Sequence, residues 1–516
     1  MIGKRVFAAV VLLAVAACAP QGTTRPAPGT PSALAVLIVV DGFAWHRVEA
    51  WSDAFDSGLR RLLDEGRVHT ECRYRHVPTE TGPGHASLMT GVPPNEHGIV
   101  ANEWFERASD GTLRRVYCGA PLEAGKGVGP WRLEADTLGD RLVRRDPRAR
   151  VVTVAGKDRS AFLTAGRDRR HQPFWYDPAE RTFVTAPYYD GIGSAREVVE
   201  RFDAARAGER LEATYGRIWS RLPPPAVSPA RPPDPAAKAA YDPYVGADFD
   251  FDLASAKRGY GYGFTRSPML DRALADVAIA LVEDDALGLG RRGATDLLVV
   301  SFSGQDYVAH AYGPDTEPAF DAVRRLDRDI GDLLDALVRR VGRERLVVGL
   351  SADHGFCPIP PSGARRFDVD VALVELNAAL PEKVAAFDGS GVWYAAGADR
   401  AKIDAAIGAA AGAVWGSWID ELIPVASIAH RHDERAEAIR ASDFPGRSPD
   451  AVAFPKPGFI PDWYEGRGST HGSVQESDRH VPMILWGAGV QAERRSEATT
   501  PYRLAPEMAE ALRIPW

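Results

Sequence analysis

Short, continuous apolar runs are the feature of this sequence that most constrains its fold. The runs are rich in Val, Leu and Ile, and they lack the polar alternation of a half-exposed strand. Such runs are typical of strands that are buried on both faces of a parallel sheet. We therefore predict buried strands at Leu34–Val40, Arg150–Val154, Leu297–Phe302, Leu346–Leu350 and Val481–Trp486.

Helical patterns alternate with these strands. Asp56–Gly66 and Phe320–Val341 repeat apolar residues at helical spacing. This alternation predicts an α/β fold, a three-layer α/β/α sandwich with a mostly parallel central sheet. Two stretches, about 169–290 and 358–470, interrupt the alternation, and structureless loops of that length are implausible. We interpret both stretches as insertions that build a cap or a smaller lobe.

The N-terminus is typical of an export signal. Lys4 and Arg5 precede the apolar stretch Val6–Ala17, which is too short to span a bilayer. The four residues that end at Cys18 resemble a lipobox, in which Cys18 is lipidated; an ordinary signal peptide cleaved nearby is the alternative. We expect an exported protein of the periplasm or cell envelope that is held to a membrane only by this lipid. The expected organisation is a signal peptide at 1–17, the lipidated Cys18 and a flexible tether at 18–32, and a catalytic domain at 33–516.

Charge and cysteine content limit the classes of partner and of metal site. The chain has 62 basic and 70 acidic residues, which argues against a broadly basic nucleic-acid binder but does not exclude an anionic substrate. Four cysteines are too few for a disulfide scaffold or a cysteine-rich metal cluster, although Cys72 and Cys118 could pair after export. A transition-metal site in this chain would therefore use mainly its aspartates and its 12 histidines.

Charged residues follow most of the predicted strands directly. Because the carboxyl ends of parallel strands meet at one edge of a sheet, where ligands bind in open α/β folds, these side chains should converge in one crevice. The alternative is a scattered surface distribution. The residues concerned are Asp41 after the first strand, Lys157 and Arg159 after the second, Asp306 and His310 after the third, and Asp353 and His354 after the fourth.

The spacing of these residues is suited to metal binding. Asp306 and His310 are four residues apart and so share a face of a helical turn. Asp353 and His354 are adjacent, and both can turn inward where a strand gives way to a loop. With Asp41 and His471 they make six oxygen and nitrogen ligands without cysteine, which suits two zinc ions. Taken singly, Asp41 is equally well a helix cap, and His471 a hydrogen-bonded loop histidine.

A candidate nucleophile lies in the segment around Thr81. Pro and two glycines indicate a turn there, and we expect a helix from His85 onward. Thr81 would then lie at a helix N-terminus, where the dipole and free N–H groups favour negative charge. A nearby metal would activate its hydroxyl. We prefer Thr81 to Thr79 because it abuts the Gly-Pro-Gly turn; a plain N-cap threonine is the alternative.

Short motifs in a fixed order reveal a family resemblance. They are VDG at 40–42, TETGPGHASLMTG at 79–91, HGIVANEW at 97–104, AGKDRSAFLTAG at 155–166, SGQDYVAHAYGPD at 303–315, SADHG at 351–355 and STHGS at 469–473. Together they resemble the alkaline phosphatase superfamily. The resemblance is closest to the bacterial phosphate-irrepressible alkaline phosphatases, which are relatives of the nucleotide pyrophosphatase/phosphodiesterases. It covers nearly the whole chain after the N-terminal segment.

The resemblance implies a role for each candidate residue. Thr81 would be the nucleophile that carries a covalent phosphoryl group. Asn102 would donate to a phosphoryl oxygen, and Lys157 with Arg159 would mark the monoesterase branch. His85 and His97 would be structural. One zinc would be held by Asp306, His310 and His471, and a second by Asp41, Asp353, His354 and the oxygen of Thr81.

We accordingly expect a zinc-dependent alkaline phosphatase, a monomer that hydrolyses small-molecule phosphate monoesters and has no nucleic-acid partner. A phosphodiesterase or nucleotide pyrophosphatase on the same site is the first alternative. A sulfatase is disfavoured because Thr81 cannot form the formylglycine that those enzymes make from Cys or Ser. The alternative from another class is a non-catalytic lipoprotein that binds metal or phosphate.

Overall fold

The computed structural model describes residues 33–516 except 124, 191–192, 230–248, 360–364, 410–417 and 463–467. The predicted signal peptide, Cys18 and the tether therefore lie outside the described residues. Among the helices that are described, none is long and apolar enough to cross a bilayer. Cys72, Cys118 and Cys357 are buried free thiols, so the pairing of Cys72 with Cys118 is not formed.

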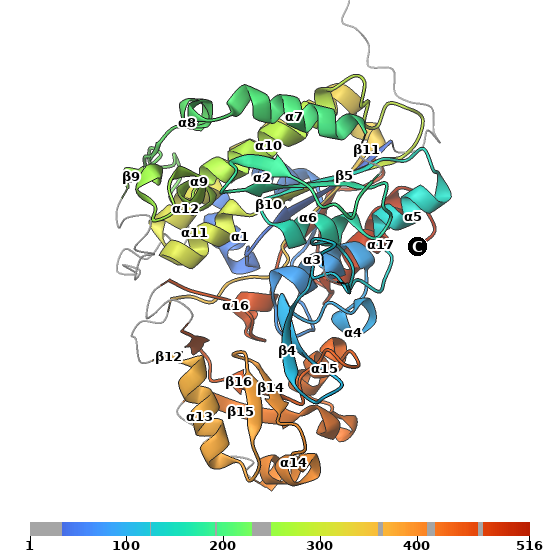
Figure 1. The fold of residues 1–516 in the computed structure, drawn as a ribbon. Coiled ribbons are helices and arrows are strands. Elements are labelled where there is room, and N and C mark those ends of the chain that lie inside the picture. The colour runs from blue at the N-terminus through green and yellow to red at the C-terminus, as the bar shows by residue number, and fades with distance from the viewer. Residues whose placement is uncertain are drawn as a thin grey trace, which may run out of the picture. The chain divides into compact units, whose positions relative to one another are not determined.

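A nine-stranded sheet organises the described part of the chain (Figure 1). Five of its adjacent strands run parallel to one another. Every residue of the central strand β1 is buried, so both faces of the sheet must be covered. The strand order is β19 (Glu493–Arg495), β2 (Arg67–His69), β18 (Met483–Gly487), β11 (Leu346–Ser351), β1 (Leu34–Val40), β10 (Asp296–Phe302), β5 (Val151–Ala155), β6 (Gln172–Asp177) and β7 (Thr182–Val184).

The predicted α/β fold with a mostly parallel central sheet is confirmed, and one strand direction is wrong. The first four predicted strands correspond to β1, β5, β10 and β11 within one residue at each end. The fifth corresponds to β18, which pairs antiparallel with β11. An apolar run reports burial on both faces and carries no information about direction, so the sequence pattern could not distinguish the two orientations.

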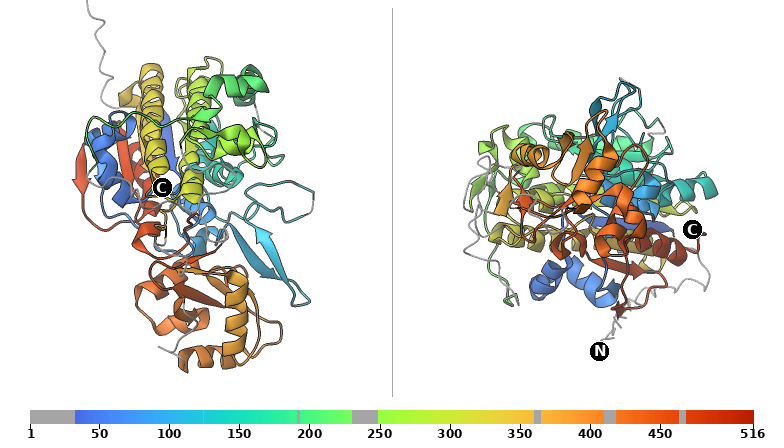
Figure 2. Two further views of the ribbon diagram at one scale, coloured as in Figure 1. Left: turned by 90° about the vertical axis from the view of Figure 1, so that its left-hand side faces the viewer. Right: turned by 90° about the horizontal axis from the view of Figure 1, so that it is seen from below.

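Helices pack against both faces of this sheet. Helices α10 and α12 lie side by side (Figure 2), and α2 packs against α12. Helices α6 and α17 contact other strands and both pack on α3. The helices associated with the sheet and its loops are α1 (Trp45–Trp51), α2 (Gly58–Glu65), α3 (Thr81–Thr90), α4 (Pro94–His97), α5 (Leu138–Arg145), α6 (Asp158–Ala165), α7 (Ser194–Arg206), α8 (Glu209–Tyr215), α9 (Tyr260–Thr265), α10 (Pro268–Glu283), α11 (Gly304–Tyr312), α12 (Glu317–Val341), α16 (Glu476–Arg479) and α17 (Leu504–Ala511).

The two stretches that interrupt the sequence pattern differ in structure. The stretch 169–290 contributes β6 and β7 to the main sheet, and its helix α10 packs on α12. The stretch 358–470 builds a second sheet with its own apolar core, in which Phe367 and Trp418 stack with ring centres 4.2 Å apart. The second sheet and its helices are β13 (Val384–Phe387), β14 (Gly391–Tyr394), β16 (Ala451–Pro455), β15 (Ile419–Pro424), α13 (Val369–Ala379), α14 (Arg400–Ala409) and α15 (Glu434–Ser442).

Smaller elements complete the described chain. They are the strand pairs β3 (Glu103–Arg107) with β4 (Leu113–Tyr117), β8 (Ile218–Trp219) with β9 (Phe251–Asp252) and β12 (Arg366–Phe367) with β17 (Ile460–Pro461), and the 3₁₀ turns Ser52–Ala54, η2 (Leu253–Ser255), Arg343–Arg345, Val425–His430 and Pro501–Arg503.

The start of α2 is fixed by a residue of α12. The carboxylate of Asp327 accepts backbone N–H groups from the segment 56–60, which satisfies the open donors of the helix N-terminus. Gly58 lies directly against α12: a Cβ atom there would be 2.3 Å from the backbone nitrogen of Gly331. The two helices are therefore in backbone contact, and no side chain fits between them.

We expect Gly58→Ala to destabilise the protein by about 1–3 kcal/mol, because the added methyl group must push α2 away from α12. The measurement is the Tm in thermal unfolding followed by circular dichroism. Gly408→Ala in α14 is the matched control: no atom lies within 4 Å of its added Cβ, and alanine is the better helix former. Equal Tm values for the two variants would contradict the close packing of α2 on α12.

Candidate metal centre and nucleophile

The ends of four parallel strands bring the predicted polar residues together. Asp41 directly follows β1. Lys157 lies two residues after the end of β5, and Asp353 lies two residues after the end of β11. Helix α11, directly after β10, carries Asp306 and His310 on one face, with 3.5 Å between a carboxylate oxygen and Nε2. The convergence predicted from the sequence pattern is therefore present.

Three histidines are held in one tautomer by backbone carbonyls. In each of His310, His354 and His471, Nδ1 lies within 2.9 Å of a carbonyl oxygen, which can only accept a hydrogen bond. Nδ1 must therefore donate, and Nε2 of the neutral ring carries a lone pair. Burial lowers the pKa of His310 and of His471, which favours this neutral form. The accepting carbonyls belong to Ser469, Gly355 and Thr79, respectively.

These lone pairs face carboxylate oxygens. His354 Nε2 is 3.4 Å from Asp41 Oδ1, and Asp306 Oδ1 lies 3.5 Å and 3.8 Å from Nε2 of His310 and His471. Both carboxylate oxygens are buried and accept no hydrogen bond from the described residues. Two ligands of a tetrahedral zinc ion lie roughly 3.3 Å apart. The arrangement therefore fits metal ligands, because a cation between the two lone pairs would turn their repulsion into attraction.

The candidate ligands form two groups that share one residue. Asp306, His310 and His471 offer ligand atoms within 4.8 Å of one another, and so do Asp41, Asp306 and His354. Asp353 borders the second group: its Oδ2 is 3.4 Å from His354 Nε2. Nitrogen and oxygen donors without sulfur suit zinc.

The carboxylates in this crevice strongly perturb one another. Burial raises the pKa of Asp41, and the charges of Asp306 and Asp353 raise it further, against the opposing effect of Lys157. Burial alone would also raise the pKa of Asp306, but the charge of Lys157 opposes this most strongly, and the pKa of Asp306 lies below its usual range. Positive charge is therefore needed in the crevice to keep these carboxylates ionised.

Lys157 supplies part of that charge. Its ammonium donates to Asp306 Oδ2 at 2.5 Å and lies 2.7 Å from Asp41 Oδ2. The same nitrogen is 3.4 Å from Thr81 Oγ1. Burial by itself would lower the pKa of Lys157, but Asp306 and Asp41 raise it above its ordinary value. The sequence predicted a contact with substrate for Lys157 and gave no sign of its contact with two of the candidate ligands.

Thr81 is the first residue of α3, so the helix begins four residues earlier than the predicted start at His85. Its Oγ1 is 3.5 Å from His354 Nε2. Gly84, one turn into the helix, is packed against the chain after β11: a Cβ there would be 2.1 Å from the carbonyl oxygen of Asp353. Only glycine permits this approach, which places the threonine hydroxyl beside the candidate ligands.

Asn102 is oriented by two hydrogen bonds. Its Oδ1 accepts the backbone N–H of Gly82 at 2.7 Å, and its own backbone N–H donates to Glu80 Oε2 at 2.6 Å. Because the amide oxygen is engaged, the amide nitrogen is the end left to donate elsewhere. Burial raises the pKa of Glu80 to about 7, although the bond from Asn102 opposes that shift.

Arg159 lies in the first turn of α6, two residues after Lys157. Its Nε is buried and has no hydrogen-bond partner among the described residues. Burial alone would lower the pKa of Arg159, but Tyr117 and Asp158 raise it, so the guanidinium keeps its charge. Arg159 and Lys157 both act electrostatically on Tyr307. The two cations thus lie in one neighbourhood, as the sequence predicted.

His85 has a larger part in the site than the sequence indicated. Its Nδ1 is 2.9 Å from the carbonyl oxygen of Thr81 and 3.1 Å from Asp353 Oδ2, and its Nε2 is 2.8 Å from Ser301 Oγ. It therefore connects the threonine segment to a candidate ligand. The spacing of four between Thr81 and His85 on a helix was the available signal. His97, by contrast, bonds Ser87 Oγ within the helical layer, as a structural residue does.

Comparison with known families gives a match over most of the chain. The family described as type I phosphodiesterase / nucleotide pyrophosphatase matches residues 35–476. This range contains all the site residues named in this subsection.

Relatives and a solved structure match over most of their length. Alkaline phosphatase PhoK of a Sphingomonas species is 28% identical over 95% of this chain and 90% of its own length. Alkaline phosphatase PhoD of Zymomonas mobilis is 28% identical over 96% of this chain and 88% of its own. The crystal structure of wild-type alkaline phosphatase PafA superposes with a TM-score of 0.80 at 22% identity, covering 94% of this chain and 96% of that one. This last likeness confirms the fold.

We expect Asp306→Ala to lose both metal ions, because Asp306 belongs to both ligand groups, whereas His310→Ala should lose one. The measurement is the zinc content per chain by elemental mass spectrometry, after saturation with zinc and dialysis. Asp203→Asn, on α7 and outside both groups, is the control and should keep the full content. An Asp306→Ala protein that retains two ions would refute the shared ligand.

Proposed function

The chain belongs to the type I phosphodiesterase / nucleotide pyrophosphatase family, and we propose that it is a zinc-dependent alkaline phosphatase that hydrolyses phosphate monoesters. The match to this family and the names of the relatives support a hydrolase of phosphoryl esters. The observation that carries the finer proposal is the position of Thr81 Oγ1, which lies 3.4 Å from Lys157 Nζ and 3.5 Å from His354 Nε2. A hydroxyl in this position is suited to attack phosphorus and to carry the phosphoryl group covalently.

In this proposal two zinc ions are held by the ligands identified above. One would be bound by Asp306, His310 and His471, and the other by Asp41, Asp353, His354 and the oxygen of Thr81. Asp306 also belongs to the group around the second ion, so its removal would affect both. When bound, the metal lowers the pKa of hydroxyl groups and neutralises negative charge on oxygen atoms around phosphorus.

The chain itself favours negative charge on Thr81. The hydroxyl lies at the N-terminus of a ten-residue helix, where the backbone dipole attracts anions. The ammonium of Lys157 adds a full positive charge at 3.4 Å. His85 Nδ1 donates to the Thr81 carbonyl and its Nε2 hydrogen-bonds with Ser301 Oγ, which fixes the backbone that carries the nucleophile. These groups orient Thr81 before substrate arrives.

The preference for monoesters is assigned to Lys157, Arg159 and Asn102. A phosphate monoester dianion has one more negative charge than a diester and no second ester group to accommodate. Arg159 would bond its oxygens through a fork of N–H donors, and Asn102 would donate through its amide nitrogen. The hydrogen bonds that Asn102 makes to Gly82 and Glu80 support this role because they hold its amide in place.

A cavity of about 230 Å³ beside the site provides space for the alcohol portion of a substrate. It borders Glu80 and His471 on the catalytic side. Phe454 and Phe459, from the stretch that builds the second sheet, line it as well, together with the acidic Asp388. A neutral alcohol with an apolar surface fits such a lining best.

The location and domain organisation are also proposals. We assign residues 1–17 to a signal peptide, Cys18 to a lipid anchor, and 33–516 to one catalytic domain with insertions at about 169–290 and 358–470. The lipobox-like sequence before Cys18 and the Pro-, Gly- and Thr-rich segment after it support an anchor in the cell envelope. The substrates would be small soluble phosphate monoesters.

Thr81→Ala should lower kcat for phenyl phosphate by at least ~10³-fold, because no other group replaces a missing nucleophile. Thr79→Ala is the matched control: its hydroxyl donates to the carbonyl of Ser473 and does not contact the candidate ligands. The comparison uses steady-state kinetics of the zinc-loaded protein. Full activity in Thr81→Ala, or a larger loss in Thr79→Ala, would show that the nucleophile is assigned wrongly.

Arg159→Ala should reduce kcat/KM for phenyl phosphate about 10²-fold more than that for diphenyl phosphate, since it removes a charge-assisted contact to the dianion. Arg114→Ala on β4, an exposed position, should change neither rate. If the wild-type protein prefers the diester, the phosphodiesterase alternative is correct. Equal losses on both substrates would show that Arg159 does not bind the additional negative charge of a monoester.

A further inference from the structure

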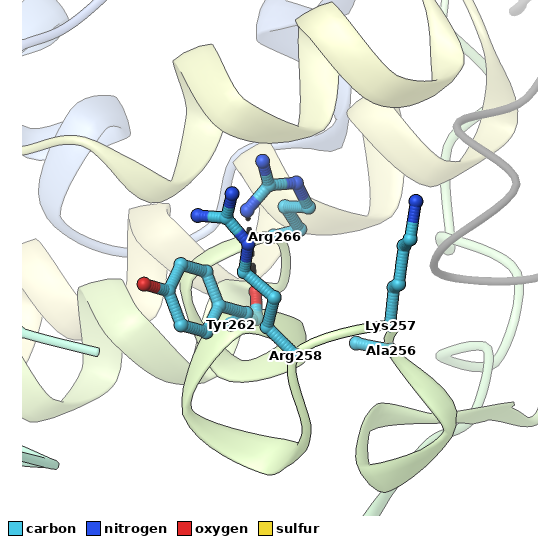
Figure 3. Close-up of a pocket in the computed structure, with 5 residues that line it drawn as sticks. All are labelled: Ala256, Lys257, Arg258, Tyr262 and Arg266. Atoms are coloured by element: carbon cyan, nitrogen blue, oxygen red, sulfur yellow. Dashed lines mark hydrogen bonds between the residues drawn. The ribbon is translucent and has the colours of Figure 1, made fainter. Parts of the chain in front are cut away.

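A second cavity, of about 390 Å³, has a cationic lining (Figure 3). It is formed by the short segment that runs from η2 into α9 and on to the start of α10. Three of the five described residues that line it are basic: Lys257, Arg258 and Arg266. The other two are Ala256 and Tyr262. The three basic side chains are cations at neutral pH, and no acidic side chain is among these five described residues.

Both arginines of the described lining are held by local contacts. The guanidinium of Arg258 lies over the ring of Tyr262, 5.1 Å from its centre. Arg266 donates to the carbonyl oxygen of Tyr262 at 3.4 Å (Figure 3). It also lies 3.4 Å from Thr265 Oγ1. Such contacts restrict the side chains before a ligand binds, which reduces the entropy lost on binding.

Tyr307 connects this cavity to the proposed phosphoryl site. Arg266 lies 5.7 Å from the centre of the Tyr307 ring, and Lys157 Nζ lies 5.2 Å from the same centre. The two cations are therefore no further apart than the sum of these distances. Burial raises the pKa of Tyr307, and Lys157, Arg159 and Arg266 all oppose that shift. One aromatic ring thus borders both groups of cations.

The cavity near Glu80 has the opposite electrostatic character. Its described lining includes the acidic side chains of Glu80, Asp388 and Glu434, and the arginine among these described residues, Arg435, is already paired with Glu421. A negatively charged part of a substrate would be repelled there and attracted to the cationic cavity. The two cavities therefore differ in the charge of the group that they can accept.

We propose that Lys257, Arg258 and Arg266 bind a second phosphoryl group of the substrate, so that the preferred substrates are phosphate monoesters that carry another phosphoryl group. This inference rests on the proposed function, because it assigns the class of substrate for the same site. The reacting phosphoryl group would lie beside Thr81 and Lys157. The other would reach past Tyr307 into the cationic cavity, where several donors can bond its oxygens.

The experiment compares 4-methylphenyl phosphate with 4-(phosphonomethyl)phenyl phosphate on the zinc-loaded protein. The phosphonate is not hydrolysable and adds a second phosphoryl-type dianion to a similar leaving group. We expect kcat/KM to be about 10-fold or more higher for the phosphonate compound, and we expect this ratio to fall as sodium chloride is raised. A ratio near one in the wild-type protein would overturn the proposal.

The double variant Lys257→Ala/Arg258→Ala should lower that ratio about 10-fold and leave kcat/KM for 4-methylphenyl phosphate within twofold. Arg169→Ala is the matched control, because Arg169 lies over Tyr188 at a similar 5.3 Å but does not line the cavity. An unchanged ratio in the double variant would also overturn the proposal. Hydrolysis of 4-methylphenyl phosphate tests the proposed function separately: if the wild-type protein hydrolyses neither compound, both inferences fail.

Discussion

The concentration of negative charge at one edge of the sheet is the constraint on which the rest of the site depends. Asp41, Asp306 and Asp353 are each buried to within 1% of full burial, and they share one crevice. Isolated buried carboxylates are strongly disfavoured, so the fold must bring cations to them. Lys157 provides one cation, and the ring nitrogens of three histidines face the oxygens that accept no hydrogen bond. A metal ion between these lone pairs would supply further positive charge.

The fold meets this need through its topology. Parallel strands end at a common edge, so residues separated by hundreds of positions in the sequence come together without long connecting loops. Backbone carbonyls then set the tautomer of each histidine, and the helix that starts at Thr81 adds its dipole. Each group is therefore fixed by main-chain atoms, which are the least variable part of the structure in conformation.

Much of this could be predicted from the sequence, because burial and periodicity leave clear patterns. The apolar runs located the central strands, and the polar residues directly after them located the crevice. The direction of β18 was not predictable, since an apolar run is the same in both directions. The contact of Lys157 with two carboxylates and the role of His85 were also missed. Both depend on distances between segments that the sequence leaves undefined. The four-residue spacing of Thr81 and His85 did indicate that the two residues share a helix face.

The close approach of Gly84 to the carbonyl of Asp353 has a consequence for motion in the site. The helix that carries Thr81 and the chain that carries Asp353 and His354 are in direct main-chain contact, with no side chain between them that could change rotamer. Thermal fluctuations of these two segments must therefore be correlated. The spacing between the threonine hydroxyl and the histidine nitrogen should vary less than the position of either segment relative to the second sheet. The main-chain segments that carry the hydroxyl and its neighbouring imidazole therefore behave as one packed unit.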